Sequence, residues 1–208
     1  MTDKIIVYTD GSCINNGKKN SIGSIGIFFS DNDSDNLSQI IDNNGCKITN
    51  ETMELLAIIQ AIKIIEKKIM NGTNIKIIYI YTDSMYIINC MTKWYTSWVN
   101  SNWKKKNGED VKNKDLIQTL YNLKNKYITI FKHVRSHQSE PTNKNSDEHK
   151  YWYGNFMADQ LAQSASSQYV KELKQNQLNN LTSDIITEKL DHINQKKNKK
   201  TTQIINQI

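Results

Sequence analysis

The chain has 208 residues and a mass of 24.1 kDa, which suits one domain of ordinary size with an appendage. It contains no apolar stretch long enough to span a bilayer, and its N-terminus lacks the basic and then apolar pattern of a secretion signal. These features argue against a membrane or secreted protein, and we expect an intracellular one.

Charge and cysteine usage narrow the class of protein further. Residues 168 to 208 hold seven Lys and four acidic groups, a net +3, and residues 93 to 114 have a local charge of +4. Basic charge gathered in two segments is expected of a protein that binds a polyanion, although a run of lysines is often only a solvated face. Cys13, Cys46 and Cys90 are too widely spaced for a disulfide framework or a zinc ligand set, as in a reducing compartment.

The first half of the chain predicts three strands and then a long helix. Residues 4 to 10 and 22 to 29 predict the first two strands, and residues 38 to 49 predict a third that Asn43-Asn44-Gly45 interrupts. A helix follows Asn50, because apolar residues recur at helical spacing until Asn71-Gly72 ends the pattern. The apolar stripe consists of Leu55, Ile58, Ile59, Ile62, Ile65 and Ile69.

The second half predicts two strands and several helices, followed by a polar tail. In chain order these are a strand at 75 to 82, helices at 85 to 94 and 115 to 123, a strand at 128 to 134 and a last core helix at 155 to 166. Beyond Ser167 the chain is rich in Gln, Asn and Lys. Residues 169 to 178 and 184 to 193 are weakly amphipathic and can form helices, whereas Lys196 to Lys200 and the C-terminus are typical of disorder.

This order of elements predicts an α/β fold in which helices pack on a mixed sheet. The first and fourth strands are joined through a helix, so the right-handed crossover rule predicts that they are parallel and adjacent. Both predicted strands end in the same three residue types, Tyr8-Thr9-Asp10 and Tyr81-Thr82-Asp83. The two aspartates should therefore lie at the same end of the sheet. Adjacent strands are roughly 4.8 Å apart, and carboxylates so placed can share two metal ions about 3.5–4 Å apart.

Two further acidic residues border buried helix faces. Glu54 projects from the edge of the apolar stripe toward the sheet, where an unpaired carboxylate must be protonated or meet a cation. Asp159 borders the packed face of the last core helix, although an acid near a helix start often only complements the helix dipole. Four carboxylates from four elements indicate instead a site for Mg²⁺ or Mn²⁺, which bind hard oxygen ligands and substrate phosphates. Hydrolysis of a phosphodiester is the natural chemistry of two such ions.

Five motifs, in this order, resemble those of ribonuclease H type 1. They are Thr9-Asp10-Gly11-Ser12-Cys13, Thr49-Asn50-Glu51-Thr52-Met53-Glu54-Leu55, Thr82-Asp83-Ser84-Met85-Tyr86, His133-Val134-Arg135-Ser136-His137 and Gly154-Asn155-Phe156-Met157-Ala158-Asp159-Gln160-Leu161-Ala162. The resemblance covers about residues 1 to 167, which would be the catalytic domain. It leaves residues 168 to 208 as a basic, Asn- and Lys-rich C-terminal extension that we expect to be partly helical or disordered.

The resemblance implies an RNase H-like fold with a five-stranded mixed sheet and helices on both faces. It also implies an endoribonuclease that hydrolyses the RNA strand of RNA·DNA hybrids and leaves 5′-phosphate and 3′-hydroxyl ends. Asp10, Glu54, Asp83 and Asp159 match the catalytic, metal-binding carboxylates of the family. The implied cofactors are two Mg²⁺ ions, with Mn²⁺ as a substitute.

The mobile-loop histidine of the family, which assists proton transfer or product release, has two candidates in this chain. His137 matches it by its motif, but His137 precedes Asp159 by 22 residues. His149 has the shorter spacing of 10 residues and lies within the insertion from Gln138 to Tyr153, which predicts a long polar loop. We favour His137, because a histidine at the end of a strand is better anchored than one in such a loop.

The resemblance also implies contacts with the DNA strand of the hybrid. Tyr86, Trp94 and Trp98 would lie beside that strand, and Thr49 and Asn113 would bind one of its phosphates. The tryptophans belong to a basic segment in which aromatic faces can pack on sugars while lysines neutralise phosphates. Trp94 and Trp98, four residues apart, can alternatively pack on their own helix.

A second set of residues is implied to face the RNA strand from the minor groove. The set comprises Cys13, Asn16, Asn50 and Met85. Asparagine side chains can donate to and accept from the 2′-hydroxyl group that distinguishes RNA from DNA. Glu51 stands where the family usually has Asn or Gln, and we expect this anionic side chain to weaken or remove one minor-groove contact.

Two other functions compete with this one. An integrase-like polynucleotidyl transferase of the same fold is disfavoured by the histidine motif and the tryptophan-lysine segment. A non-catalytic module that binds RNA·DNA hybrids has no reason to hold four acids near phosphates. We expect a monomer that needs no small-molecule cofactor and acts in the cytoplasm or wherever replication occurs, the nucleus included.

Overall fold

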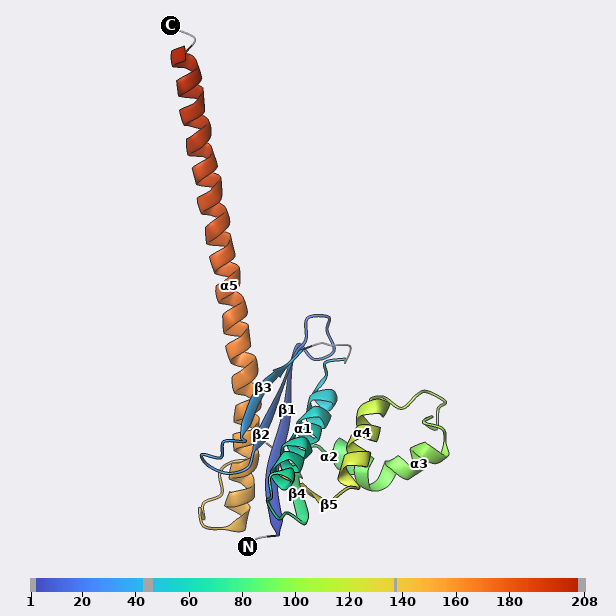
Figure 1. Ribbon diagram of the computed structural model, residues 1–208. Helices are drawn as coiled ribbons and strands as arrows, with labels where there is room; N and C mark the ends of the chain where they lie inside the picture. Colours follow the sequence, from blue (N-terminus) through green and yellow to red (C-terminus); the bar gives the residue numbers. More distant parts are fainter. Residues whose placement is uncertain (1–2, 43–46, 137, 206–208) are drawn as a thin grey trace. The chain divides into compact units, whose positions relative to one another are not determined.

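The computed structural model describes residues 3–42, 47–136 and 138–205, with side chains up to Thr182 (Figure 1). Contacts between Cα atoms divide the chain into two compact units, Met1–Ser167 and Gln168–Ile208. None of the helices in these described ranges combines the length and the apolar character needed to cross a membrane. Cys46 and the Asn43-Asn44-Gly45 turn fall outside the described residues.

The first unit is built on a five-stranded mixed sheet with the strand order β3-β2-β1-β4-β5. Its strands are β1 (Lys4–Ile14), β2 (Ile22–Phe28), β3 (Leu37–Ile41), β4 (Ile77–Thr82) and β5 (Ile128–His133). The pairs β1–β2 and β2–β3 are antiparallel, whereas β4 is parallel to both β1 and β5. The predicted parallel and adjacent arrangement of the first and fourth strands is therefore confirmed.

Helices lie on both faces of the sheet, as predicted (Figure 1). They are α1 (Asn50–Met70), α2 (Met85–Asn89), the π-helix η1 (Cys90–Trp94), α3 (Tyr95–Asn100), α4 (Lys114–Lys124) and α5 (Asp147–Ile205). Helix α1 packs on one face of the sheet, and the beginning of α5 packs on the other. Two backbone carbonyls of α5, those of Leu161 and Ala162, accept hydrogen bonds from the serine hydroxyls of Ser38 and Ser24.

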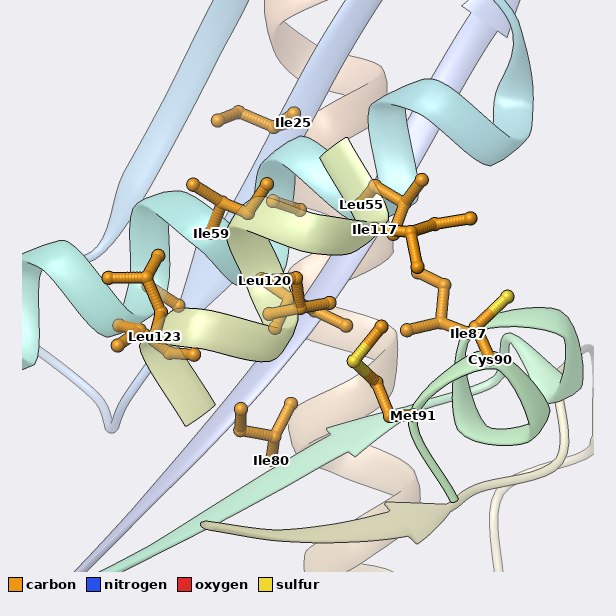
Figure 2. Packing of buried hydrophobic residues seen from close by; sticks show 14 of the residues in the cluster. Ile25, Leu55, Ile59, Ile80, Ile87, Cys90, Met91, Ile117, Leu120 and Leu123 are labelled. Atoms are coloured by element: carbon orange, nitrogen blue, oxygen red, sulfur yellow. The ribbon is translucent and has the colours of Figure 1, made fainter. Parts of the chain in front are cut away.

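The main core lies between α1, the sheet and the following helices. Ile58, Ile62 and Ile65 of the predicted apolar stripe are completely buried, and each such side chain contributes about 1.5–3 kcal/mol by leaving water. Figure 2 shows α4 and η1 completing this core, with Leu120 and Met91 pointing into it. The fold class predicted from the sequence, a five-stranded mixed sheet with helices on both faces, is confirmed.

Two boundaries of the sheet differ from the prediction. Strand β1 does not end at Asp10 but continues to Ile14, because the antiparallel ladder with β2 runs on to the Ile14–Ile22 pair. The strand stops only at the turn around Asn15, whose backbone is left-handed (φ 55°) and whose carbonyl accepts from Lys18. Strand β3 ends at Ile41, which is earlier than the expected third strand.

The last helix also differs from the prediction, at both ends. It begins at Asp147 rather than at residue 155, because Ser146 Oγ accepts a hydrogen bond from the backbone nitrogen of His149 and so caps the helix. It continues to Ile205 through the segment that we expected to be disordered, Lys196 to Lys200. The chain has no Gly or Pro after Gly154, and Lys and Gln are good helix formers.

Candidate active site

A close contact between β1 and α1 brings the first two acidic residues together. Gly11 follows Asp10 in β1, and a Cβ atom at Gly11 would lie only 2.2 Å from the backbone nitrogen of Glu54. Because glycine has no side chain, the backbone of the first turns of α1 can lie directly against the backbone of β1 at this position. Asp10 and Glu54 are therefore brought to the same region from two different elements.

A second glycine has the same effect on the other face of the sheet. Gly26 of β2 is paired with Asp10, and a Cβ atom at Gly26 would lie 1.9 Å from the carbonyl oxygen of Ala158. Helix α5 therefore crosses the sheet in direct contact with the β2 backbone. Asp159, the next residue of α5, is brought toward Asp10 by this contact. It is the thirteenth residue of the helix, so the interpretation of Asp159 as an acid near a helix start is wrong.

The fourth acidic residue, Asp83, lies directly after β4. The next residue, Ser84, caps α2 by accepting a hydrogen bond from the backbone nitrogen of Ile87. The Ser84 hydroxyl donates in turn to Glu54 Oε2 over 2.5 Å. Because Ser84 is anchored at a helix start, it fixes the orientation of the Glu54 carboxylate beside Asp83.

All four predicted carboxylates line one cavity of about 630 Å³, which we call the carboxylate cavity. Two of the residues predicted to face RNA, Cys13 and Asn50, line the same cavity. The complete lining is Asp10, Gly11, Ser12, Cys13, Asn50, Glu54, Asp83, Arg135, Ser136, Gln138, Trp152, Asn155, Phe156 and Asp159. The structure thus brings together residues that lie as far apart as 149 positions in the sequence.

Burial and the charges of neighbouring acids raise the proton affinity of Asp10 and Glu54. The pKa of Asp10 is raised well above its ordinary value by burial and then by the charges of Asp83 and Asp159, although the Gly11 N–H opposes this. Burial is also the main cause that raises the pKa of Glu54 to about 7, while the hydrogen bond from Ser84 lowers it. A bound cation would therefore favour the ionised forms of Asp10 and Glu54 at neutral pH.

The donor set fits a hard divalent cation that is only partly coordinated by protein. Within the described ranges, no three His, Cys, Asp or Glu side chains converge closely enough to enclose a metal ion. Mg²⁺ commonly binds to one or two carboxylates and takes its other ligands from water and substrate phosphates. Oxygen donors around an open cavity of this size suit such a cation.

Of the two candidates for the loop histidine, the structure describes only His149. His137 lies outside the described residues, so its placement stays a prediction. His149 lies in the first turn of α5 rather than in a long loop, which corrects the expectation for this part of the insertion. Its Nε2 is 2.9 Å from Glu140 Oε1, and its ring stacks on that of Tyr153. His149 is not among the described residues that line the carboxylate cavity.

Most residues predicted to contact the DNA strand gather in a second hollow of about 450 Å³. Its lining consists of Lys47, Thr49, Glu51, Tyr86, Trp98, Lys105, Val111, Lys112 and Asn113. Thr49 is the N-cap of α1, and Asn113, held in the left-handed region (φ 58°), donates from Nδ2 to the Tyr86 hydroxyl over 3.5 Å. Three lysines give the hollow a positive charge, and Glu51 lies here rather than in the carboxylate cavity.

The other predicted contact residues lie outside both linings. The Trp94 ring contacts the rings of Tyr86 and Trp98, at centroid distances of 6.3 and 5.5 Å, and is 38% exposed. Met85 is exposed at the start of α2, and Asn16 is exposed in the turn after β1. Trp98 packs against the core, so the alternative of intramolecular packing holds for this tryptophan.

Several residues of the carboxylate cavity were not predicted from the sequence. Trp152, Asn155 and Phe156 lie on the same helix face as the predicted Asp159, at the spacing of a single face. This signal was hidden because the helix was expected to begin only at residue 155. The Trp152 and Phe156 rings stack with centroids 5.3 Å apart, and Asn155 is 7% exposed, with its Oδ1 atom lacking a hydrogen-bond partner among the described residues.

The sheet order, the helices on both faces and the four acids at the end of the β1–β4 ladder define an α/β protein of the RNase H-like class. The structure of LC9-RNase H1, described as a type 1 RNase H with the type 2 active-site motif, superposes with a TM-score of 0.53 and 26% identity. The match covers 79% of this chain and 74% of that one. LC11-RNase H1 in complex with an RNA/DNA hybrid has a TM-score of 0.51 over 80% of this chain and 99% of that one. Its 18% identity supports the fold alone.

Comparison of the sequence with known proteins identifies the family to which the chain belongs. The model of the RNase H family matches residues 2–167. Ribonuclease H of Rickettsia akari and ribonuclease HI of Rickettsia conorii are each 34% identical over 174 residues, which is 84% of this chain and 98% of theirs. The chain belongs to the RNase H family, whose members are in general metal-dependent, and it is an RNase H enzyme.

Proposed function

We propose that the protein is an endoribonuclease that hydrolyses the RNA strand of RNA·DNA hybrids and leaves 5′-phosphate and 3′-hydroxyl ends. The observation that carries this proposal is the convergence of Asp10, Glu54, Asp83 and Asp159 on one cavity in a chain of the RNase H family. The ribonuclease H relatives agree with it. The catalytic unit is residues 1–167.

The cofactors that we propose are two Mg²⁺ ions, for which Mn²⁺ can substitute. Asp10, Glu54, Asp83 and Asp159 would hold them, since carboxylate oxygens are the preferred ligands of both metals. When bound, such a pair supplies an activated water and stabilises the leaving oxygen of the phosphodiester.

The side chains around the acids keep the carboxylates oriented. Ser84 Oγ donates to Glu54, and Gln163 Nε2 donates to Asp159 Oδ1 over 2.6 Å. The Gly11 N–H stabilises the ionised form of Asp10. Each acid so held leaves its other oxygen for a cation, which limits the reorganisation needed when substrate arrives.

Recognition of the RNA strand would come from the wall of the carboxylate cavity that Cys13 and Asn50 form. The Asn50 amide can donate to and accept from a 2′-hydroxyl, which a DNA strand lacks. Asn16 and Met85 are exposed and would extend this contact along the minor groove.

The second hollow would hold the DNA strand. Thr49 and Asn113 would bind a phosphate there, with Tyr86 and Trp98 beside the sugars and Trp94 extending the aromatic surface. Lysines of the same hollow would add a salt-dependent attraction for the phosphates. Glu51 also lines this hollow, and we continue to expect its carboxylate to weaken or remove one minor-groove contact.

Proton transfer or product release would be assisted by His137 rather than by His149. The His149 ring is already engaged by Glu140 and Tyr153, so it is not free to reach the substrate. We also propose that the protein acts as a monomer without a small-molecule cofactor, inside the cell where hybrids arise. The extension formed by residues 168–208, with a net charge of +3, would be an appendage to the catalytic unit.

A cleavage assay with an end-labelled hybrid tests the function. The purified protein should cut the RNA strand of an RNA·DNA hybrid in the presence of Mg²⁺ and leave the DNA strand, duplex DNA and duplex RNA intact. Binding without cleavage would identify a hybrid-binding module instead. Joining or nicking of the DNA strand would identify a polynucleotidyl transferase, and either result would overturn the proposal.

A further inference from the structure

The basic residues of this chain are 26 lysines and a single arginine, Arg135. Arg135 lines the carboxylate cavity, and it is the one positively charged side chain among the described residues of that lining. Lysine and arginine are not equivalent, because a planar guanidinium presents a fork of N–H groups that matches two oxygens of one phosphate. The single arginine therefore lies at a position where a guanidinium could bind two oxygens of one phosphate, which a lysine ammonium group cannot match.

The register between β4 and β5 fixes the backbone of Arg135 beside an active-site acid. Thr82 is paired with His133, and the nitrogen of Val134 donates to the carbonyl of Thr82 over 3.1 Å. Asp83 directly follows Thr82 and Arg135 directly follows Val134, just beyond the ends of β4 and β5. The base of the arginine side chain is thus held at the end of the sheet, next to the acids.

The guanidinium is free to bind a ligand. Arg135 is exposed, and within the described part of the chain it makes no hydrogen bond or ion pair. Among the described residues it lines a cavity with four carboxylates, yet it forms no ion pair with Asp10, Glu54 or Asp159. An arginine serving only to neutralise those acids would be expected in contact with at least one.

We propose that Arg135 binds a phosphate of the RNA strand beside the scissile one, through two parallel N–H···O bonds, and so sets the register of that strand over the acids. This inference rests on the proposed function. The RNA strand is favoured because Arg135 shares its cavity with Cys13 and Asn50, whereas Thr49 and Asn113 line a different hollow. A neighbouring phosphate is favoured because the oxygens of the scissile one face the acid-bound cations.

The test compares Arg135→Ala, Arg135→Lys and the control Lys132→Ala. Lys132 is an exposed cation on β5 that lines a separate hollow with Tyr79 and Tyr81. Hybrid affinity is measured without divalent ions at several salt concentrations. Arg135→Ala should weaken binding about tenfold and reduce the slope of log Kd against log salt by about 1. Arg135→Lys should keep the slope but regain only part of the affinity, and Lys132→Ala should change neither.

A second measurement identifies the phosphate. Hybrids in which one linkage at a time is an uncharged methylphosphonate are bound to the wild type and to Arg135→Ala. At one RNA linkage beside the cleaved one, the two losses of affinity should be non-additive, because both changes remove the same contact. Additive losses at every RNA linkage, coupling to a DNA linkage, or full rescue by Arg135→Lys would overturn the inference. Cleavage of the unmodified hybrid by the wild type tests the proposed function separately.

Discussion

Asp10 and Asp83 each lie two residues beyond Tyr8 and Tyr81, which form the last pair of the parallel ladder between β1 and β4. Beyond this pair β1 is paired only with β2. The strands β1 and β4 are therefore no longer paired with each other where the two aspartates follow. The ladder register therefore places Asp10 and Asp83 close together in the lining of the carboxylate cavity. Their proximity contributes to the raised pKa of Asp10, after the larger effect of burial.

The raised pKa of Glu54 predicts a pH-dependent stability in protein freed of metal with EDTA. The folded state holds this proton up to about pH 7, whereas the unfolded chain loses it near the ordinary value of 4.5. The free energy of unfolding should therefore fall as pH rises between these values. Glu54→Gln should remove this loss and be more stable than the wild type at pH 8 by about 3 kcal/mol, with little difference at pH 4.5.

Urea unfolding at the two pH values measures this effect. Glu172→Gln is a matched control, because Glu172 is an exposed acid on the second unit. Wild type and Glu54→Gln following parallel curves from pH 4.5 to pH 8 would contradict the account of Glu54.

Addition of Mg²⁺ is predicted to stabilise the folded protein at pH 8. The cation offsets the repulsion among Asp10, Glu54, Asp83 and Asp159, and it binds the folded state alone. At 10 to 100 times the dissociation constant the gain is roughly 1.4–2.7 kcal/mol, which thermal unfolding detects as a rise in Tm. Asp10→Asn should lose most of the rise. An equal rise in the variant would show that Mg²⁺ binds elsewhere.

Gly26→Ala should damage both stability and catalysis. The added methyl group would lie 1.9 Å from the Ala158 carbonyl, so α5 must move, and with it Asp159. We expect a loss of about 1–3 kcal/mol from overpacking and a clear fall in kcat. Gly17→Ala is the matched control, because Gly17 has a positive φ of 77° but open space around it. It should cost stability without reducing kcat, and equal kcat values for all three proteins would contradict the role of the Gly26 contact.

Replacing the two histidines separately tests the choice between them. His137→Ala should lower kcat by roughly 10²-fold, which is typical of the loss of a group that assists proton transfer. His149→Ala should leave kcat within about twofold and reduce stability slightly, because it removes the contacts with Glu140 and Tyr153. Single-turnover and steady-state rates on the same hybrid distinguish chemistry from product release. The reverse order of effects would assign the function to His149.

The sequence was sufficient to predict the elements whose signal is local or repeated. The apolar stripe from Leu55 to Ile69 predicted α1. The matching Tyr-Thr-Asp sequences that end in Asp10 and Asp83 helped to predict two adjacent parallel strands. The right-handed crossover rule linked these two predictions, because the two strands are joined through α1. The gathering of four acids from four elements on one cavity agrees with the expectation drawn from their separate positions.

The features that were missed depend on tertiary contacts. Strand β1 extends beyond Asp10 because β2 pairs with it, and no local pattern in Gly11-Ser12-Cys13 shows this. The early start of α5 had a signal, since Ser146 is followed by two acids, but the polar composition of the segment obscured it. With that start unknown, the helix face that carries Trp152 and Asn155 into the cavity could not be recognised.

The most direct test of the central claim is the rate at which Asp10→Asn cleaves an RNA·DNA hybrid in Mg²⁺, measured with the affinity of the same variant for the hybrid. If the carboxylate cavity is the active site, cleavage should fall below detection while the Kd without divalent ions stays within about threefold of the wild type. This is expected because Asn keeps the size of Asp but lacks the charge that holds a cation. Near-normal turnover by Asp10→Asn would contradict the assignment of the four acids.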